Sequence, residues 1–373
     1  MKIAFYCPNK PLNHPEPSGD QTIARGIFEA LNRLGHECRE VAVFRARWFW
    51  RRPKGWGRAA RALTEAFRLC RAWRPDLWLT YHTYYKAPDV IGPWVSRHLG
   101  IPYVLFQPMY STKRRRDPRT RPGFHLNRAA LLACRHAVTN NRNDVAALLR
   151  ILPARAVSLI PPGIFPEEFP RDEAAGREVR RALGLAETDR VLITVARFRP
   201  GVKWESLRFL LDALGREPLR RQSFRLLLVG DGPLEEQVRA AAERILSSRA
   251  ILTGRVERSH LHRYLSAADL FVFPGIGESL GMVYLEAQAC GLPVAALRQG
   301  GVDQVVEDGV TGLLVSDPDP DAFARAVARL LADRDLRLGM GRQARRFVYT
   351  RRNLHRNYRH LSRLLEAVAS GKT

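Results

Sequence analysis

Two glutamates, Glu278 and Glu286, stand eight residues apart in a stretch flanked by glycines. The apolar run 270–274 has the pattern of a buried strand, and residues 282–290 have helical spacing. Eight residues make a little over two helical turns, so both carboxylates could face one ligand. The loop before the helix would present backbone N–H groups, which suit a phosphate or a sugar hydroxyl. An arbitrary pair at this spacing is a helix cap and a surface residue, but the strand-ending, glycine-rich context favours a binding site.

Two cations follow another predicted strand, residues 191–196. Arg197 comes directly after it, and Lys203 comes six residues later. Because the carboxyl ends of parallel strands face the ligand crevice of an α/β domain, these cations could hold a diphosphate. Such pairs also arise by chance in a chain with 61 lysines and arginines. The chain has neither a G-x-G-x-x-G fingerprint nor a P-loop, so neither kind of nucleotide site is predicted.

His82 and a run of aspartates are further candidates. His82 ends a predicted strand, residues 76–81, where it could orient a sugar hydroxyl on the acceptor side or serve as a structural histidine. Asp317, Asp319 and Asp321 have the D-x-D spacing of a metal site. The prolines between them favour a turn and a helix cap instead, so we predict no metal ligand there.

The elements that position these residues alternate between strand and helix along the 373-residue chain. This pattern predicts an α/β protein with two doubly wound, Rossmann-like domains that face each other across a cleft. We place the boundary at a proline- and glycine-rich linker. The predicted domains are 1–163 and 164–350, with a C-terminal helix, 351–373, packing back on the first.

The net charge of +24 is uneven and indicates an anionic partner. Residues 1–163 carry 28 Lys and Arg against 10 Asp and Glu, and the remainder carries 33 against 27. Residues 45–74 mix ten of these cations with four tryptophans, which fits an anionic membrane surface, a solvated helix with inward tryptophans, or single-stranded nucleic acid. A second basic segment, 112–121, lies within a charged stretch, 111–122, that we expect to be a mobile surface loop or a flap over an acidic acceptor.

Five widely spaced cysteines favour a reducing compartment over a disulfide framework. Residues 1–7 are too short an apolar run for a signal peptide, and no run approaches 18 apolar residues. We therefore expect a cytoplasmic protein that associates peripherally with the inner face of the plasma membrane.

Taken in order, the motifs of the second half closely resemble the retaining GT-B glycosyltransferases of the GT4 type, the glycosyltransferase group 1 family. The motifs are Val195-Ala-Arg197 with Lys203, Val229-Gly-Asp-Gly-Pro233, Gly254-Arg-Val256, Ala268-Asp269, the Glu278 to Glu286 stretch, and Gly300-Gly301. The resemblance covers almost the whole second domain and only the outline of the first.

The resemblance implies a nucleotide-diphosphate sugar as donor, with a UDP-sugar favoured, and neither a cofactor nor a metal. Arg197 and Lys203 would neutralise the diphosphate, and Glu278 would hold the sugar as the third catalytic residue. The further donor-binding residues that it implies are Gly19 in the first loop, Arg255 and Val256 at the base, Ser279, Leu280 and Gly281 as backbone donors, and Glu286 at the ribose.

Several positions depart from the family pattern: Ala196 and Trp204 replace the usual glycines, and Gln107 or Pro108 stands where many members have a histidine. The departure at Gln107 or Pro108 concerns the acceptor side. We expect a hexosyltransferase that acts on a lipid-linked or polysaccharide acceptor in cell-envelope glycan synthesis. The alternatives are a soluble transferase with a small-molecule acceptor and a non-catalytic nucleic-acid-binding protein on this fold. We expect no nucleic-acid partner.

Overall fold

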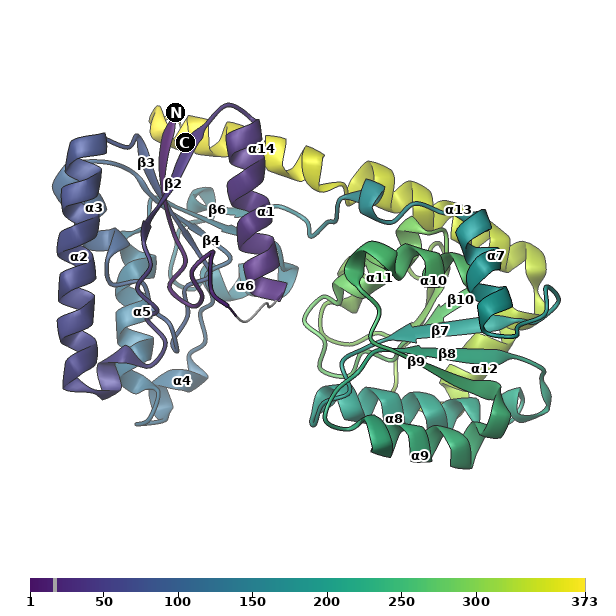
Figure 1. The fold of residues 1–373 in the computed structure, drawn as a ribbon. Coiled ribbons are helices and arrows are strands. Elements are labelled where there is room, and N and C mark those ends of the chain that lie inside the picture. Colours follow the sequence, from purple (N-terminus) through teal and green to yellow (C-terminus); the bar gives the residue numbers. More distant parts are fainter. Residues whose placement is uncertain (16–18, 373) are drawn as a thin grey trace. The chain divides into compact units, whose positions relative to one another are not determined.

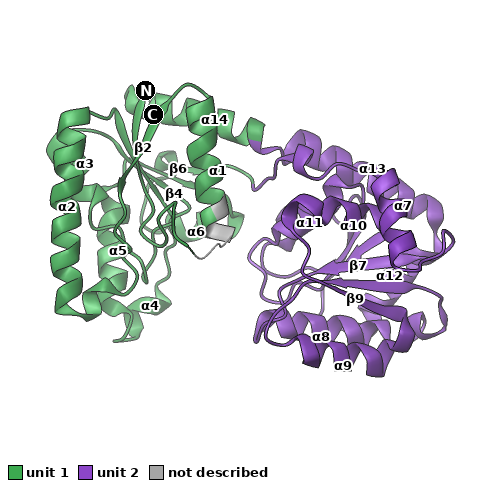
Figure 2. Cartoon of the chain, in the orientation of Figure 1, with its two compact units in different colours: residues 1–161, 355–373 green, residues 162–354 purple. Residues whose placement is uncertain are grey.

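The computed structural model describes residues 1–15 and 19–372, which form two compact units (Figures 1 and 2). Unit 1 comprises Met1–Pro161 together with His355–Thr373, and unit 2 comprises Pro162–Leu354. Each unit has a six-stranded parallel sheet with helices on both faces, which confirms the predicted pair of doubly wound α/β folds.

The sheet of unit 1 has the strand order β2-β1-β3-β4-β5-β6. Its strands are β1 Lys2–Tyr6, β2 Glu37–Ala42, β3 Leu77–Tyr81, β4 Tyr103–Phe106, β5 His136–Thr139 and β6 Val157–Leu159. Its main helices are α1 Gly19–Arg33, α2 Pro53–Trp73, α3 Gly92–Leu99, α4 Lys113–Arg116, α5 Arg121–Ala133, α6 Arg142–Leu148 and the C-terminal α14 Leu354–Ala369. Helix α14 is held there by a 2.7 Å hydrogen bond between His36 Nε2 and Ser362 Oγ.

The sheet of unit 2 has the order β12-β11-β10-β7-β8-β9. Its strands are β7 Val191–Val195, β8 Arg225–Val229, β9 Ala250–Gly254, β10 Leu270–Val272, β11 Val294–Leu297 and β12 Gly312–Val315. Its main helices are α7 Glu173–Ala182, α8 Val202–Leu214, α9 Glu235–Leu246, α10 Leu261–Ala267, α11 Met282–Ala289, α12 Pro320–Ala332 and α13 Arg334–Arg351. In Figure 1, α8 and α9 cover one face of this sheet, and α7, α10 and α11 cover the other.

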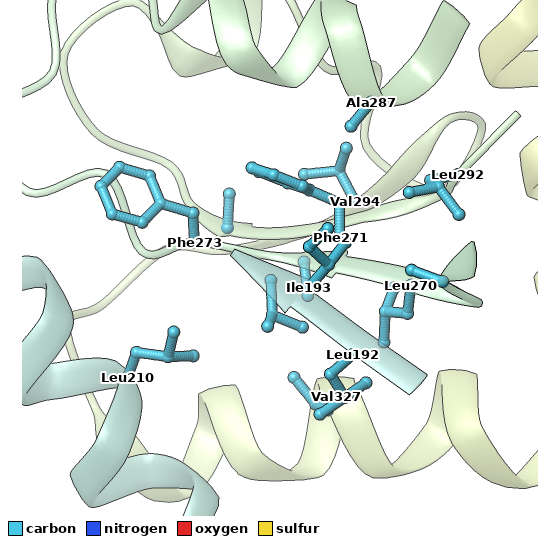
Figure 3. Packing of buried hydrophobic residues seen from close by; sticks show 14 of the residues in the cluster. Leu192, Ile193, Leu210, Leu270, Phe271, Phe273, Ala287, Leu292, Val294 and Val327 are labelled. Carbon is cyan, nitrogen blue, oxygen red and sulfur yellow. The ribbon is translucent and has the colours of Figure 1, made fainter. Parts of the chain in front are cut away.

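The strands of unit 2 are continuous apolar stretches of sequence because the core buries both of their faces. Parallel strands bury both faces, and here side chains from β7 and β10 meet helix residues above and below the sheet (Figure 3). Phe271 and Ile193 are paired in register between β10 and β7, and both are fully buried. The central strands are therefore fixed in place, and the loops at their carboxyl ends are held with them.

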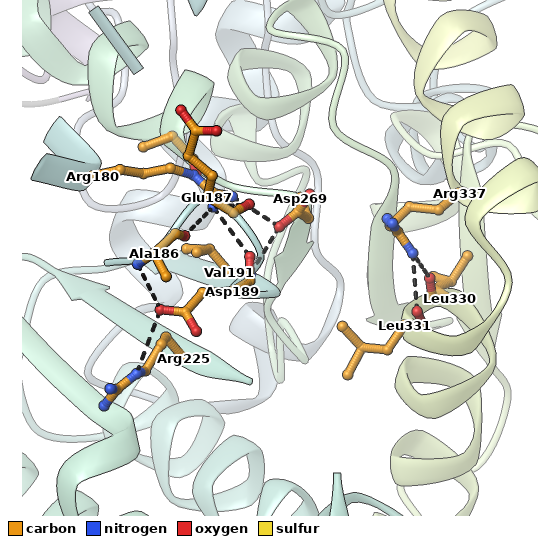
Figure 4. Close-up of polar contacts among 11 residues, drawn as sticks. Arg180, Ala186, Glu187, Asp189, Val191, Arg225, Asp269, Leu330, Leu331 and Arg337 are labelled. Atoms are coloured by element: carbon orange, nitrogen blue, oxygen red, sulfur yellow. Dashed lines mark hydrogen bonds and ion pairs between the residues drawn. The ribbon is translucent and has the colours of Figure 1, made fainter. Parts of the chain in front are cut away.

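Asp269 joins the amino ends of the two central strands, β7 and β10 (Figure 4). Its Oδ2 accepts hydrogen bonds from Val191 N at 2.8 Å and from Arg180 Nη2 at 3.0 Å. The same guanidinium also donates to the backbone carbonyls of Ala267 and Asp189. Asp269 in the Ala268-Asp269 motif is thus structural: it joins the amino ends of β7 and β10, away from the loops that carry the candidate site.

One sequence expectation about regular structure was wrong. The charged stretch 111–122 is not an irregular loop, because it contains α4 and the start of α5, and Thr120 Oγ1 donates to the Arg114 carbonyl at 2.8 Å. The C-terminal helix expected over 351–373 is α14, Leu354–Ala369, and it belongs to unit 1. Helix α13 ends at Arg351, and in the short gap before α14 the Arg352 carbonyl accepts a hydrogen bond from Ile164 N at 2.9 Å.

Candidate functional site

Lys203 and Glu278 meet where the strand order of unit 2 reverses. The chain leaves β7 toward β8 and β9 on one side, then returns to β10 on the other side of β7. Loops that diverge in this way leave a crevice at the carboxyl ends of the two strands. Lys203, in the first turn of α8, donates from Nζ to Glu278 Oε2 in the loop after β10. The two side chains are 19% and 20% exposed, so the pair is half-buried but open to a ligand.

The loop that carries Glu278 is anchored to helix α8 by Ser206. Its hydroxyl accepts a hydrogen bond from Ile276 N at 3.0 Å and donates to the Val202 carbonyl at 2.7 Å. The Lys203 ammonium also lies 5.0 Å from the centroid of the Phe273 ring, at the end of β10. These contacts hold the cation over the carboxyl end of the central strand, because a cation is attracted to an aromatic face.

Arg197 is the second cation at this edge, and its partner is Asp231. The guanidinium Nη1 lies 3.2 Å from Asp231 Oδ1, and the Arg197 side chain is 63% exposed. The glycines around Asp231 allow the close approach: a Cβ at Gly230, which has φ +146°, would lie 1.8 Å from the Ala196 carbonyl oxygen. The turn after β8 therefore lies directly against the residue after β7. Asp231 in that turn pairs with Arg197 and leaves the guanidinium largely open to solvent.

The backbone between the two glutamates forms a tight turn into α11. Gly281 has φ +74° and is the N-cap of α11, and the Leu280 side chain is buried. Behind the turn, a Cβ at Gly301 would lie 2.1 Å from the Ser279 carbonyl oxygen. The N-terminus of α11 carries partial positive charge, so this turn suits an anion or a hydroxyl.

Glu286 faces a partner that the sequence did not single out. It lies on α11 with its side chain 9% exposed, and its Oε1 accepts a 2.5 Å hydrogen bond from Arg258 Nη1. Arg258 also donates to Glu168 Oε2, from Nη2 at 3.0 Å and from Nε at 3.3 Å, and stacks on Phe169 at 4.7 Å. Burial opposes the charge on Arg258, but Glu286 and Glu168 outweigh it, so the pKa of Arg258 is raised. Its only sequence signal is its place four residues after Gly254, which many arginines could share.

The residues expected to contact the base follow β9. Arg255 is exposed and forms an ion pair with Glu257 at 3.4 Å. Val256 is half-buried and packs against the apolar core of unit 2. Both residues follow the carboxyl end of β9, which is the edge strand next to β8. They therefore lie at the same end of the sheet as the loops after β7 and β10, but farther from its centre.

The candidates of unit 1 lie at the carboxyl ends of its own strands. His82 follows β3, is buried, and has φ +59°, and its N–H donates to the Phe106 carbonyl at 2.8 Å. Gln107, which follows β4, also has a positive φ and accepts a hydrogen bond from the Tyr81 hydroxyl at 3.1 Å. Gly19 is the first residue of α1, and residues 16–18, which precede it, are outside the described part of the chain.

The two basic segments of unit 1 lie against each other. Arg51 Nη2 donates to the Arg119 carbonyl at 3.3 Å, and the Arg51 guanidinium stacks on Trp48 at 3.8 Å. Arg114 lies over Tyr85 at 4.5 Å, and Tyr85 in turn contacts Trp48. We call the exposed cations of this region the basic surface; they are Arg51, Arg52, Lys54, Arg114, Arg115 and Arg119.

The tryptophans of residues 45–74 differ in exposure. Trp73 is buried and donates from Nε1 to Glu37 at 3.1 Å, and Trp48 and Trp50 are half-buried. Trp56 is 49% exposed on α2, among exposed cations. Among the described residues, no helix is both long and apolar enough to cross a bilayer.

The sequence of this chain is similar to those of known glycosyltransferases. Residues 189–333 match the family model "Glycosyl transferases group 1". The chain is 31% identical over 290 residues to a D-inositol 3-phosphate glycosyltransferase of Acidothermus cellulolyticus, an alignment that spans 72% of this chain and 63% of the relative.

Residues 189–333 of this chain belong to glycosyltransferase group 1.

A second relative in the family is the GDP-mannose-dependent alpha-(1-6)-phosphatidylinositol monomannoside mannosyltransferase of Mycobacterium tuberculosis. It is 35% identical over 204 residues, or 52% of each chain. The chain thus spans about half to two thirds of the length of these curated relatives. The matched family region includes Arg197, Lys203, Glu278 and Glu286, and it stops short of unit 1.

Solved structures show the same GT-B fold along nearly the whole chain. HepE from Anabaena, solved in complex with UDP, superimposes with a TM-score of 0.76 at 20% identity and covers 98% of this chain and all of its own. WaaG, a glycosyltransferase involved in lipopolysaccharide biosynthesis, gives a TM-score of 0.68 at 18% identity over 97% of this chain and 99% of its own. At these identities the likeness establishes the fold.

Proposed function

We propose that this protein transfers a hexose, with retention, from a nucleoside-diphosphate sugar to a lipid-linked or polysaccharide acceptor of the cell envelope. The observation that carries the proposal is the Lys203–Glu278 pair at the strand reversal of unit 2. It sets an ammonium and a carboxylate side by side where a ligand crevice is expected, with Arg197 exposed at the same edge. Cations there suit a diphosphate, and a carboxylate suits the hydroxyls of a sugar.

The chemistry follows from where charge develops. When the bond between the sugar and the diphosphate breaks, negative charge grows on the leaving phosphate. Lys203 and Arg197 would stabilise that charge, together with the N-terminus of α11. Donor phosphates would draw Lys203 from Glu278, whose carboxylate would then accept hydrogen bonds from the sugar.

The donor class is supported by the names of similar proteins, which point to two bases. HepE has been solved with UDP and with UDP-glucose, and the mycobacterial relative is GDP-mannose-dependent. We favour a UDP-sugar and keep a GDP-sugar as the alternative. The name of the Acidothermus relative supports a small phosphorylated acceptor as the alternative to a lipid-linked one.

Peripheral binding to the inner face of the plasma membrane is part of the proposal. The basic surface brings together cations from both basic segments, which would attract anionic headgroups, and Trp56 could enter the headgroup layer. Because the other tryptophans of residues 45–74 are wholly or half buried, we expect electrostatic attraction to dominate this binding.

The test of the donor assignment is a panel of UDP-, GDP- and ADP-sugars, scored by thermal shift and by release of the nucleoside diphosphate. We expect one base to raise the melting temperature and to support turnover in the wild type. Stabilisation and turnover should both be lost in a folded Lys203→Ala variant. Failure of every nucleotide sugar to bind the wild type, with salt-sensitive binding of RNA or DNA instead, would refute the proposal.

A further inference from the structure

Glu286 is a buried carboxylate whose two oxygens have different surroundings. Oε1 accepts the hydrogen bond from Arg258, whereas Oε2 accepts none from any residue that the structure describes. A carboxylate so deeply buried is costly unless a cation accompanies it. Arg258 therefore both supplies the cation beside Glu286 and determines which of its oxygens is left for a ligand.

Arg258 is itself fixed from two further directions. Glu168 accepts from its Nε and Nη2, which leaves Nη1 for Glu286. Phe169 supports the plane of the guanidinium, with 4.7 Å between the Arg258 Cζ and the ring centroid. A planar guanidinium held on one edge and one face has little rotational freedom, so the direction of Nη1 is set before any ligand arrives.

The contacts of α11 with the same stretch reinforce this arrangement. Cys290, one turn after Glu286, donates from Sγ to the Phe169 carbonyl at 3.5 Å, and Arg171 Nη1 donates to the Cys290 carbonyl at 3.3 Å. Residues 168–171 thus hold α11 at its C-terminal end and, through Arg258, at Glu286.

We propose that Arg258 is the positioning residue for ribose recognition: held by Glu168 and Phe169, it occupies Glu286 Oε1 and thereby presents Oε2 to the ribose hydroxyls of the donor. The inference rests on the proposed nucleotide-sugar function and adds to it a residue that acts through another. Substituting Arg258 should remove the preference for ribose hydroxyls while leaving the diphosphate contacts of Lys203 and Arg197 in place.

The experiment compares UDP and GDP with their 2′,3′-dideoxy forms by calorimetric titration. The wild type should bind the parent nucleotide about tenfold or more tightly than the dideoxy form, because hydrogen bonds to a charged acceptor are strong. In Arg258→Gln the two forms should bind within about twofold of each other, and Arg258→Lys should restore part of the difference. The matched control is Arg263→Gln on α10, which removes an exposed ion pair with Glu178 of α7 and should keep the wild-type ratio.

Kinetics provide a second readout that a merely structural role would not produce. Arg258→Gln should raise the KM for the donor more than it lowers kcat, since ribose is bound in both ground and transition states. In the double variant Arg258→Gln/Glu286→Gln, binding should match that of Arg258→Gln alone. If Arg258→Gln does not fold, the same titrations are made with Glu168→Gln. This variant should reduce the preference for the parent nucleotide over its dideoxy form without abolishing it.

The outcomes separate the two proposals. Binding of no nucleoside diphosphate by the wild type would refute the proposed function itself. Tight binding with an unchanged parent-to-dideoxy ratio in folded Arg258→Gln would overturn the role of Arg258 and leave the transferase proposal standing. Equal binding of the parent and dideoxy forms by the wild type would likewise overturn ribose recognition at Glu286.

Discussion

Lys203 and Glu278 are 75 positions apart in the chain, and in the fold the Lys203 ammonium donates to the Glu278 carboxylate. Each follows a central strand of the second sheet, and those strands are neighbours because the order reverses between β7 and β10. Without ligand, each charge satisfies the other. Under the proposed function, a diphosphate would replace Glu278 as the partner of Lys203, and a sugar would replace Lys203 as the partner of Glu278. Little buried charge would then be left unpaired in either state.

Replacing Lys203 by alanine tests the cation at the strand reversal. We expect Lys203→Ala to lower kcat for the nucleotide sugar by about 10²–10³-fold, because it removes a group that stabilises charge on the leaving phosphate. Arg208→Ala is the matched control, since Arg208 is an exposed cation on the same helix. Steady-state release of the nucleoside diphosphate measures both. Wild-type turnover in Lys203→Ala would contradict the assignment.

A methyl group at Gly301 tests how the Glu278 loop is supported. In Gly301→Ala the new Cβ would lie 2.1 Å from the Ser279 carbonyl oxygen, so the loop must shift. We expect a loss of about 1–3 kcal/mol in the free energy of unfolding, together with weaker donor binding. Chemical denaturation and thermal shift measure the two effects.

Its control is Gly339→Ala in α13, where a Cβ would have open space apart from the tip of Arg342 at 4.0 Å. Alanine in the interior of a helix should stabilise by about 0.5–1 kcal/mol. Equal effects of the two substitutions would show that the loop does not depend on this contact.

Charge reversal tests the basic surface. The triple variant Arg51→Glu/Arg52→Glu/Lys54→Glu should bind vesicles containing phosphatidylserine about 100-fold more weakly, since each cation near an anionic surface contributes about 1 kcal/mol. Co-sedimentation at low and high salt measures the effect, and the wild type should be released by salt. Arg177→Glu/Arg181→Glu/Arg220→Glu makes the same change in net charge on unit 2. An equal loss of vesicle binding in both triple variants, or no loss in the first, would contradict membrane binding by the basic surface.

Acid sensitivity of unit 1 should depend on His136. Burial lowers the pKa of this histidine, whose Nε2 lies 2.9 Å from Ser158 Oγ. The unfolded chain then binds a proton at higher pH than the folded one does. Stability is therefore present above the ordinary histidine pKa of about 6.5 and is lost as the pH falls toward the lowered folded-state pKa.

Melting temperatures at pH 8 and pH 5.5 check this expectation. His136→Gln should show a smaller drop between the two values than the wild type, and His125→Gln, at an exposed position, should behave like the wild type. An equal drop in all three proteins would assign the acid sensitivity to other groups.

Local patterns in the sequence were sufficient to predict the parallel α/β architecture. Apolar runs such as 226–229 become central strands because parallel sheets bury both faces, and glycines such as Gly281 mark where strand-to-helix turns must bend. These patterns also placed Arg197, Lys203, Glu278 and Glu286 after strands or on a helix. They could not predict partners, because a partner depends on which strands are neighbours.

Tertiary structure alone decided the pairings. Lys203 meets Glu278, Asp231 reaches Arg197, and Arg258 joins Glu286 to Glu168, across separations that no local pattern encodes. It also decided which tryptophan of residues 45–74 is exposed, since helical spacing gives the faces of α2 but not what covers them. The physical reason is the same in each case: the backbone responds to neighbours in sequence, whereas charge pairing and burial respond to neighbours in space.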